Sequence, residues 1–114
     1  MDRKIEPKYE VLEQTDNGVL VELDIEEDLE YFKGHFDDAP ILAGIVQLDW
    51  AVKLSRRYFK VVGHVSSVNA LKFKNLIVPG TKIQLRLQYK SQTSFEYSYF
   101  MGEKVFSSGR ITLE

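Results

Sequence analysis

The residues best suited to chemistry are one histidine and one carboxylic acid, His35 and Asp49, which lie fourteen positions apart. A neutral imidazole can remove a proton near neutral pH. Asp49 is flanked by Leu48 and Trp50, and a carboxyl group in such an apolar setting is costly to ionise and can be held as a proton donor. Together the two side chains could carry out general acid–base catalysis.

Each candidate residue also has a structural interpretation. A histidine between aromatic residues commonly packs or faces solvent, and Asp49 could face water or cap a neighbouring group. Gly44 could allow close packing against a sheet, or it could present a bare N–H at a helix N-terminus, which favours an oxygen that gains negative charge. His64 follows Gly63 at the start of a predicted strand and is expected to be structural.

The elements that must position these residues are mostly strands. The turn at residues 16–18 separates predicted strands at Tyr9–Glu13 and Val19–Ile25, because Asn and Gly tolerate positive φ. Four further strands are expected in the second half of the chain, because apolar residues alternate along most of them. They are Val61–Lys74, residues 82–89, residues 95–101 and Lys104–Leu113.

The one helix that the pattern predicts runs from Ile41 to Phe59. Its first half is apolar almost all round, which indicates burial on every side, and its second half has a polar face. One helix with five or six antiparallel strands predicts an α+β fold in which the helix covers one face of the sheet. At 114 residues the chain is expected to form a single domain, residues 1–114.

Composition excludes several function classes. Fifteen Lys and Arg against 17 Asp and Glu give a net charge of −2, which argues against a general nucleic-acid-binding surface. Without cysteine there is no disulfide, thiolate nucleophile or cysteine metal site. The longest apolar run, Ala39–Val46, is too short to span a membrane, and Met1–Lys8 lacks the apolar region of a signal peptide. We expect a cytoplasmic protein.

Taken together, the candidate residues resemble a known signature. Residues 34–36 (Gly-His-Phe), Pro40, Gly44 and Asp49 have the spacing of the motif G-H-F-P-x-x-P-x-x-P-G, followed by Glu or Asp fourteen residues after the His, in 3-hydroxyacyl-[acyl-carrier-protein] dehydratases. Residues 71–80, a basic and aromatic strand leading into Val-Pro-Gly, resemble the second characteristic stretch of that family. The likeness covers about residues 8–114.

The resemblance implies a hot-dog fold, in which a curled antiparallel sheet wraps around one long helix. It also implies a homodimer, often assembled further, that pairs His35 with Asp49 of the partner subunit. The reaction would be loss of water from a 3-hydroxyacyl thioester to give a trans-2-enoyl thioester. His35 would be the base and Asp49 the proton donor, while the Gly44 N–H would bind the thioester oxygen and the Ile41 carbonyl would orient His35. No metal or organic cofactor is needed.

The sequence departs from the family signature at three places. Asp37 and Ala43 stand where the family has proline, which relaxes the loop between them. Lys53 stands four residues after the acid, where the family usually has glutamine. These departures indicate a specialised dehydratase, for which polyene or other secondary lipid synthesis is one candidate pathway.

A basic cluster at the end of the predicted helix could bind an acidic partner. It consists of Lys53, Arg56, Arg57 and Lys60, with Lys72 and Lys74 further along the chain. Because the acyl carrier protein is acidic, this cluster is a candidate docking surface. The alternatives are an ordinary solvated face and a substrate carried on coenzyme A.

Two other functions fit the same fold. A hot-dog acyl thioesterase also uses a carboxylate on the central helix, but it does not need the Gly-His-Phe sequence. A non-catalytic acyl-binding subunit is the second alternative, which the loss of two signature prolines leaves open. Release of free thiol would identify the thioesterase, and binding without turnover would identify the binding subunit.

Overall fold

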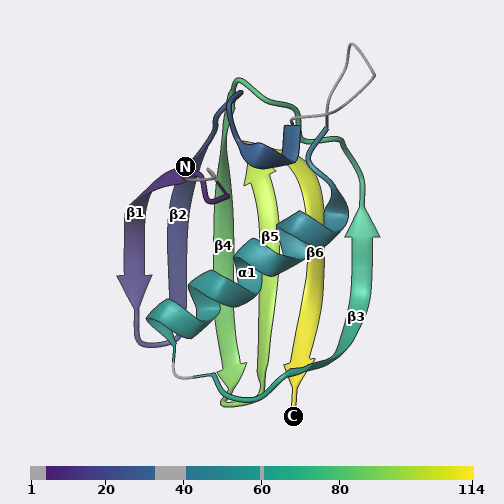
Figure 1. Ribbon diagram of the computed structural model, residues 1–114. Helices are drawn as coiled ribbons and strands as arrows, with labels where there is room; N and C mark the ends of the chain where they lie inside the picture. Colours follow the sequence, from purple (N-terminus) through teal and green to yellow (C-terminus); the bar gives the residue numbers. More distant parts are fainter. Residues whose placement is uncertain (1–4, 33–40, 60) are drawn as a thin grey trace.

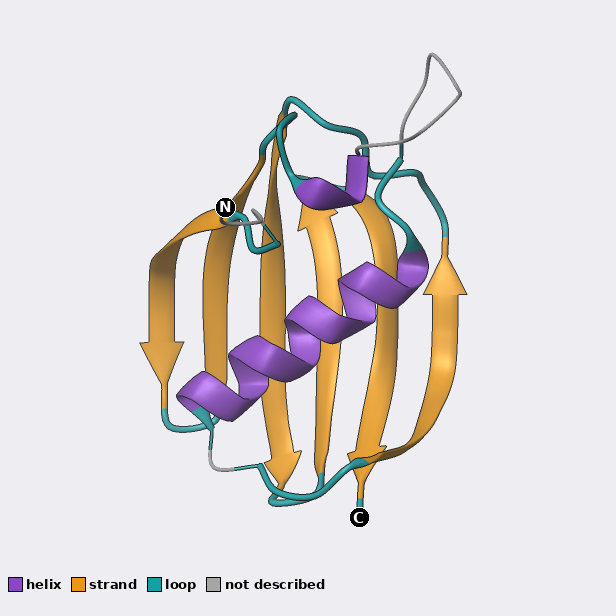
Figure 2. Cartoon of the chain, viewed as in Figure 1, coloured by secondary structure: helices purple, strands orange, loops and turns teal. Residues whose placement is uncertain are grey.

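The computed structural model describes residues 5–32, 41–59 and 61–114. Six strands and one α-helix are found in these ranges, together with a short 3₁₀ helix, η1 (Glu30–Phe32), before the helix (Figures 1 and 2). In chain order the strands and the α-helix are β1 (Lys8–Thr15), β2 (Gly18–Ile25), α1 (Gly44–Tyr58), β3 (Val65–Phe73), β4 (Thr81–Ser91), β5 (Ser94–Met101) and β6 (Lys104–Leu113).

The six strands form one antiparallel sheet in the order β1-β2-β4-β5-β6-β3. The β1–β2 hairpin therefore lies at one edge, and β3, which follows the helix in the chain, lies at the opposite edge. Helix α1 crosses one face of the sheet diagonally, from the β6–β3 side to the β1–β2 side (Figure 1). This arrangement confirms the predicted α+β architecture and places the start of α1, with Gly44 and Asp49, on the β6–β3 side of the sheet.

The core lies between α1 and the sheet. Ile83, Leu85 and Leu87 of β4 are fully buried, while the polar residues between them point to the other face, as a strand's alternation requires. Val46 and Trp50 bury the opposing side of α1. Each such side chain contributes about 1.5–3 kcal/mol on burial, so the apolar packing holds the helix on the sheet.

Two predicted boundaries are corrected by the structure. Helix α1 begins at Gly44 rather than Ile41, because Ala43 has an extended backbone (φ −64°, ψ 147°) and the Leu42 N–H bonds the Ile77 carbonyl instead. Strand β3 begins at Val65 rather than Val61. Gly63 explains this shift, since its φ of +97° interrupts an extended strand.

The composition of the first half of α1 predicts burial on every side, but the structure shows that one side is exposed. Val46, Gln47 and Trp50 are buried, but Ile45 is 74% exposed and Asp49 also faces outward. The single chain supplies a sheet for only one side of the helix, so the remaining apolar surface stays open. In the described ranges, α1 also lacks the length and apolar character that a membrane-crossing helix requires.

Candidate active site

The predicted site residues are described only in part. His35 falls in residues 33–40, and Lys60 is also outside the described residues. Their positions relative to the other candidates therefore stay predictions. Asp49, Gly44 and Ile41 are all described, and each lies in or just before the first half of α1.

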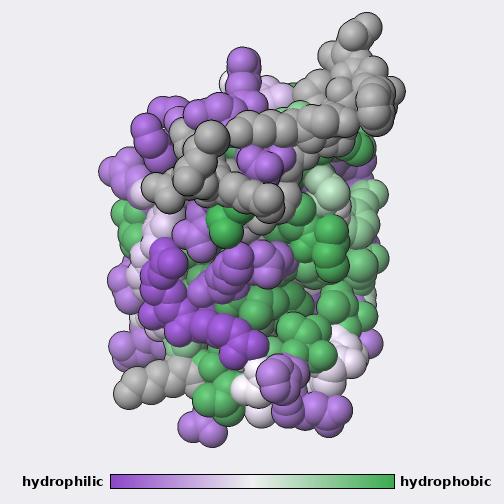
Figure 3. All heavy atoms as spheres, in the orientation of Figure 1, coloured by the Kyte–Doolittle hydropathy of each residue, from purple (hydrophilic) through white to green (hydrophobic). Residues whose placement is uncertain are grey.

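Asp49 borders an apolar hollow between α1 and the edge strand β3. The hollow has a volume of about 480 Å³ and is lined by the apolar residues Ile45, Val46, Leu48, Val52, Val65, Val68 and Ile111, with Asp49 as the charged member. Figure 3 shows apolar surface (green) on this side of the molecule, next to hydrophilic surface (purple) over the second half of the helix. A carboxylate at the rim of an apolar hollow suits a substrate that combines an acyl chain with a polar reacting group.

The Asp49 carboxylate is ion-paired and not buried in the single chain. Its Oδ2 lies 2.9 Å from Nζ of Lys53, one helical turn later, and the two side chains are 47% and 39% exposed. The expectation of a buried carboxyl is therefore not met in this chain. The reason is the open hollow, which leaves Asp49 in contact with solvent.

Gly44 is the first residue of α1 and packs closely against Phe73. A Cβ added at Gly44 would lie 2.6 Å from Cζ of Phe73, so the close-packing interpretation is confirmed. The helix has no side-chain cap at Ala43, whose carbonyl accepts the N–H groups of Val46 and Gln47 at 3.1 and 3.2 Å. The use of the Gly44 N–H for an oxygen ligand stays a prediction.

A second cleft, of about 290 Å³, lies against this helix N-terminus. Its lining combines the segment before and at the start of α1 with the end of β3 and the residues that follow: Ile41, Leu42, Ala43, Gly44, Gln47, Phe73, Lys74, Asn75 and Leu76. Ile41 and Gly44, the two predicted substrate-binding residues, both line this cleft.

The contact between Gly44 and Phe73 predicts how a substitution at Gly44 changes the stability of the protein. We expect Gly44→Ala to lower the free energy of unfolding by about 0.5–1 kcal/mol, because the new methyl group must displace the Phe73 ring, which is 52% exposed and has room to move. Denaturant unfolding of Gly44→Ala, Phe73→Ala and the double variant gives the coupling between the two sites. A Gly44→Ala chain as stable as the wild type, or two purely additive substitutions, would contradict the close contact.

The three described cations of the predicted docking cluster on α1, Lys53, Arg56 and Arg57, each have a local partner. Lys53 pairs with Asp49, and Nη2 of Arg56 donates to the Gly63 carbonyl at 2.7 Å. Nη1 of Arg57 donates to the Tyr9 hydroxyl at 2.6 Å and lies 3.8 Å from a Glu6 carboxylate oxygen. The two arginines remain exposed, so they keep N–H groups that can meet an acidic surface.

The other two lysines of the predicted basic cluster are separated from these cations. Lys72 borders a hollow on the far side of the sheet, together with Arg86 and Arg110. Lys74 borders the cleft at the helix N-terminus. A docking surface at the end of α1 is therefore limited to the helix cations.

A buried polar cluster that sequence reasoning missed connects α1 to the sheet. Gln47 is 3% exposed, and its Oε1 accepts a 2.6 Å hydrogen bond from the Ser107 hydroxyl. The Tyr99 hydroxyl donates to the main-chain carbonyl of Gln47 at 2.6 Å, and burial raises the pKa of Tyr99 well above its usual value of 10. The signal in the sequence was Gln47, an uncharged polar residue among the apolar residues of the first half of the helix.

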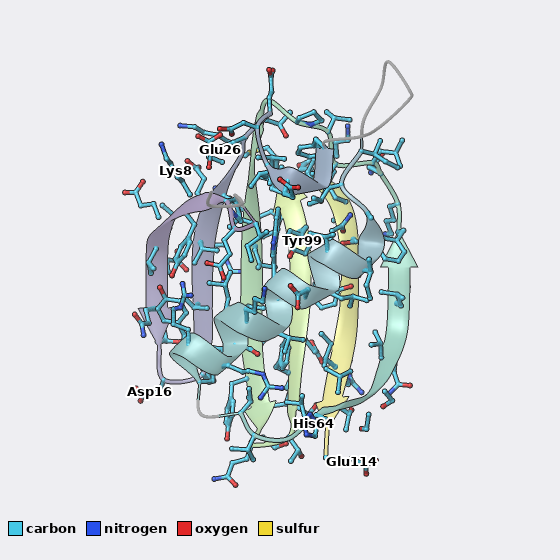
Figure 4. All side chains as sticks on the ribbon, viewed as in Figure 1. Lys8, Asp16, Glu26, His64, Tyr99 and Glu114 are labelled. Carbon is cyan, nitrogen blue, oxygen red and sulfur yellow. The ribbon has the colours of Figure 1, made fainter. Side chains whose placement is uncertain are left out.

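His64 lies away from this cluster, beside the C-terminus at the other end of the sheet (Figure 4). Its backbone exchanges two 2.8 Å hydrogen bonds with Glu114, which gives it the structural place expected from the sequence. Across residues 5–32, 41–59 and 61–114, no three His, Cys, Asp or Glu side chains come together in a way that could hold a metal ion.

Comparison with known proteins gives both a family and a fold. A family model described as ApeI-like, ApeI dehydratase, matches residues 11–110. The search of curated proteins finds no match. A solved structure titled the dehydratase heterocomplex ApeI:P, from Xenorhabdus doucetiae, is similar with a TM-score of 0.85 and 23% identity, over 95% of this chain and 97% of that one.

Two further solved structures extend the likeness. An uncharacterized protein from Erwinia carotovora subsp. atroseptica has a TM-score of 0.66 and 29% identity, over 96% of this chain and 94% of that one. Thioesterase superfamily member 2 from Mus musculus has a TM-score of 0.66 and 16% identity, over 93% and 80%. These likenesses confirm the predicted hot-dog fold, but a fold shared with a thioesterase does not by itself select a reaction.

Proposed function

The chain belongs to the ApeI-like dehydratase family, and we propose that it removes water from a 3-hydroxyacyl thioester to give the trans-2-enoyl thioester. The observation that carries the proposal is the family match over residues 11–110. The position of Asp49 at the rim of an apolar hollow supports it, because the reaction needs a proton-transfer group beside a site for an acyl chain.

The proposed chemistry needs two proton transfers. His35 takes the proton from the carbon next to the thioester carbonyl, and the charge that builds on the carbonyl oxygen is held by the Gly44 N–H. The carbon–oxygen bond of the 3-hydroxyl then breaks, the Asp49 carboxyl gives its proton to the leaving oxygen, and water departs. Solvent then returns a proton to Asp49 and takes one from His35, so both groups regain the protonation states in which the next reaction begins.

The ion pair with Lys53 means that the Asp49 side chain must move for the proposed reaction to occur. The Lys53 ammonium lies 2.9 Å from the Asp49 carboxylate in the single chain. In the proposal, Asp49 gives up this contact so that its carboxyl group can face the leaving hydroxyl. Closure of the hollow by a second subunit would supply the surroundings in which this occurs.

In this proposal a second subunit covers the hollow, so that His35 of one subunit pairs with Asp49 of the partner subunit. The exposed apolar side chains of Ile45 and Val65, which both line the hollow, support such an interface, since isolated chains rarely expose large apolar patches. We propose a homodimer. The solved relative is titled a heterocomplex, so a second, different hot-dog chain is the alternative partner.

Water loss is tested directly by mass spectrometry. A short 3-hydroxyacyl thioester and its trans-2-enoyl counterpart, each linked to acyl carrier protein and to coenzyme A, are incubated with the wild-type chain. We expect interconversion of the pair with a mass change of one water. Release of free thiol without interconversion would instead support the thioesterase, and binding without turnover would support the acyl-binding subunit.

The carrier proposal predicts a selective effect of two arginines. We expect charge reversal at Arg56 and Arg57 to raise KM for a substrate linked to acyl carrier protein about tenfold, because acidic docking surfaces are recognised by complementary charge. The KM for a small thioester analogue should stay nearly unchanged. Arg86→Glu, on the far side of the sheet, is the matched control. Equal losses on both substrates would refute docking at this surface.

A further inference from the structure

The buried carboxamide of Gln47 joins the sheet to the segment that leads into α1. Its Nε2 donates to the main-chain carbonyl of Leu42 at 3.0 Å, and its Oε1 accepts from the Ser107 hydroxyl of β6 at 2.6 Å. Both ends of the amide are therefore used inside the protein. A buried amide that lost these partners would be costly, so the bonds fix the position of the side chain.

Leu42 is held from two directions as a result. Its N–H bonds the Ile77 carbonyl at 2.8 Å, in the connection between β3 and β4, while its carbonyl accepts the Gln47 amide. Leu42 is itself buried. With both backbone groups bonded, the peptide units on either side of Leu42 have little freedom to turn.

The two backbone groups that the proposed mechanism uses lie in or next to those peptide units. The Ile41 carbonyl belongs to the unit before Leu42, and the Gly44 N–H belongs to the unit that follows the one after Leu42. Ile41, Gly44 and Gln47 all line the same cleft at the start of α1. A shift of the Leu42 carbonyl would therefore move both groups relative to a substrate in that cleft.

We propose that Gln47 is a positioning residue for the dehydration reaction, because it holds Leu42 and so sets the place of the Ile41 carbonyl and the Gly44 N–H. The proposal rests on the proposed function. Gln47 does not touch the reacting atoms in it; it acts through the backbone of the preceding segment. Misplacement of about 1 Å at a site of this kind can cost 10²-fold in rate.

Tyr99 offers a matched control for loss of packing. Its hydroxyl makes an equally buried 2.6 Å hydrogen bond to the same residue, Gln47, but to the helix main chain and not to Leu42. Tyr99→Phe and Gln47→Met each remove buried hydrogen bonds between α1 and the sheet while preserving size. A purely structural role for Gln47 predicts that both substitutions affect activity in proportion to the stability they lose.

The test compares kcat, KM and stability for the full-length wild type, Gln47→Met and Tyr99→Phe, with a 3-hydroxyacyl thioester as substrate. We expect Gln47→Met to lower kcat about 10- to 100-fold with KM within about threefold, and Tyr99→Phe to lower kcat no more than about threefold. Similar kcat losses in the two variants, or an unchanged kcat in folded Gln47→Met, would overturn the proposal. If Gln47→Met does not fold, Ser107→Ala takes its place, with an expected loss of about three- to tenfold.

Hydrogen exchange separates this inference from the proposed function, because it needs no substrate. We expect the Leu42 amide to exchange at least about tenfold faster in Gln47→Met and at the wild-type rate in Tyr99→Phe. Unchanged exchange at Leu42 would overturn the positioning role whatever the reaction is. Faster exchange together with a wild type that does not interconvert the substrate pair would refute the dehydratase and, with it, the role of Gln47 in that reaction.

Discussion

Asp49→Asn and His35→Ala are each expected to lower kcat for water loss by about 10²–10⁴-fold, the range that a positioned proton-transfer group contributes. Asparagine keeps the size of the Asp49 side chain but has no acidic proton for the leaving hydroxyl. Alanine at position 35 removes the base. Both effects are measured by following the conversion of a 3-hydroxyacyl thioester to the enoyl product at saturating substrate.

Stability is the control that makes the Asp49 result interpretable. The carboxylate is 47% exposed, and its ion pair with Lys53 is an i,i+4 surface pair, which contributes only about 0.3–0.5 kcal/mol. Asp49→Asn should therefore unfold at nearly the wild-type denaturant concentration. A folded Asp49→Asn chain with more than about a tenth of wild-type kcat would show that another group donates the proton.

Ile45→Asp is expected to prevent assembly and, with it, water loss. Ile45 is 74% exposed in the single chain and lines the hollow beside Asp49. If a second subunit covers the hollow, the substitution buries a charge without a partner, at a cost of several kcal/mol. Sedimentation measurements should then find a monomer where the wild type is a dimer.

Leu12→Asp is the matched control for the interface, since Leu12 is 42% exposed on β1 at the opposite edge of the sheet. It should leave both assembly and activity unchanged. A dimer that tolerates Ile45→Asp would place the interface elsewhere. A wild-type monomer that is fully active would contradict the shared site itself.

Much of the fold could be predicted because it depends on local patterns. The alternation of Ile83, Leu85 and Leu87 with polar residues gives a strand with one buried face, and the structure confirms it. The positions of Gly44 and Asp49 on one helix also followed from the sequence. In each case the relevant neighbours are a few residues apart, so spacing alone defines the geometry.

The remaining features depend on contacts between distant residues. The bonds that hold Gln47 reach Tyr99 and Ser107, 52 and 60 positions away, and no local pattern indicates them. Ile45 was predicted to be buried because its neighbours in the sequence are apolar. In the structure it is exposed, because no described part of this chain packs over it. The pairing of His35 with Asp49 of the partner subunit stays a prediction for the same reason.

The central claim, a dehydratase site that takes His35 from one subunit and Asp49 from the other, is tested most directly by mixing two inactive variants. His35→Ala and Asp49→Asn chains are co-expressed in equal amounts and assayed for water loss. Random pairing makes about half of the dimers mixed, and each mixed dimer has one intact site, so we predict about a quarter of wild-type activity. A mixture as inactive as its components, although mixed dimers have formed, would contradict the claim.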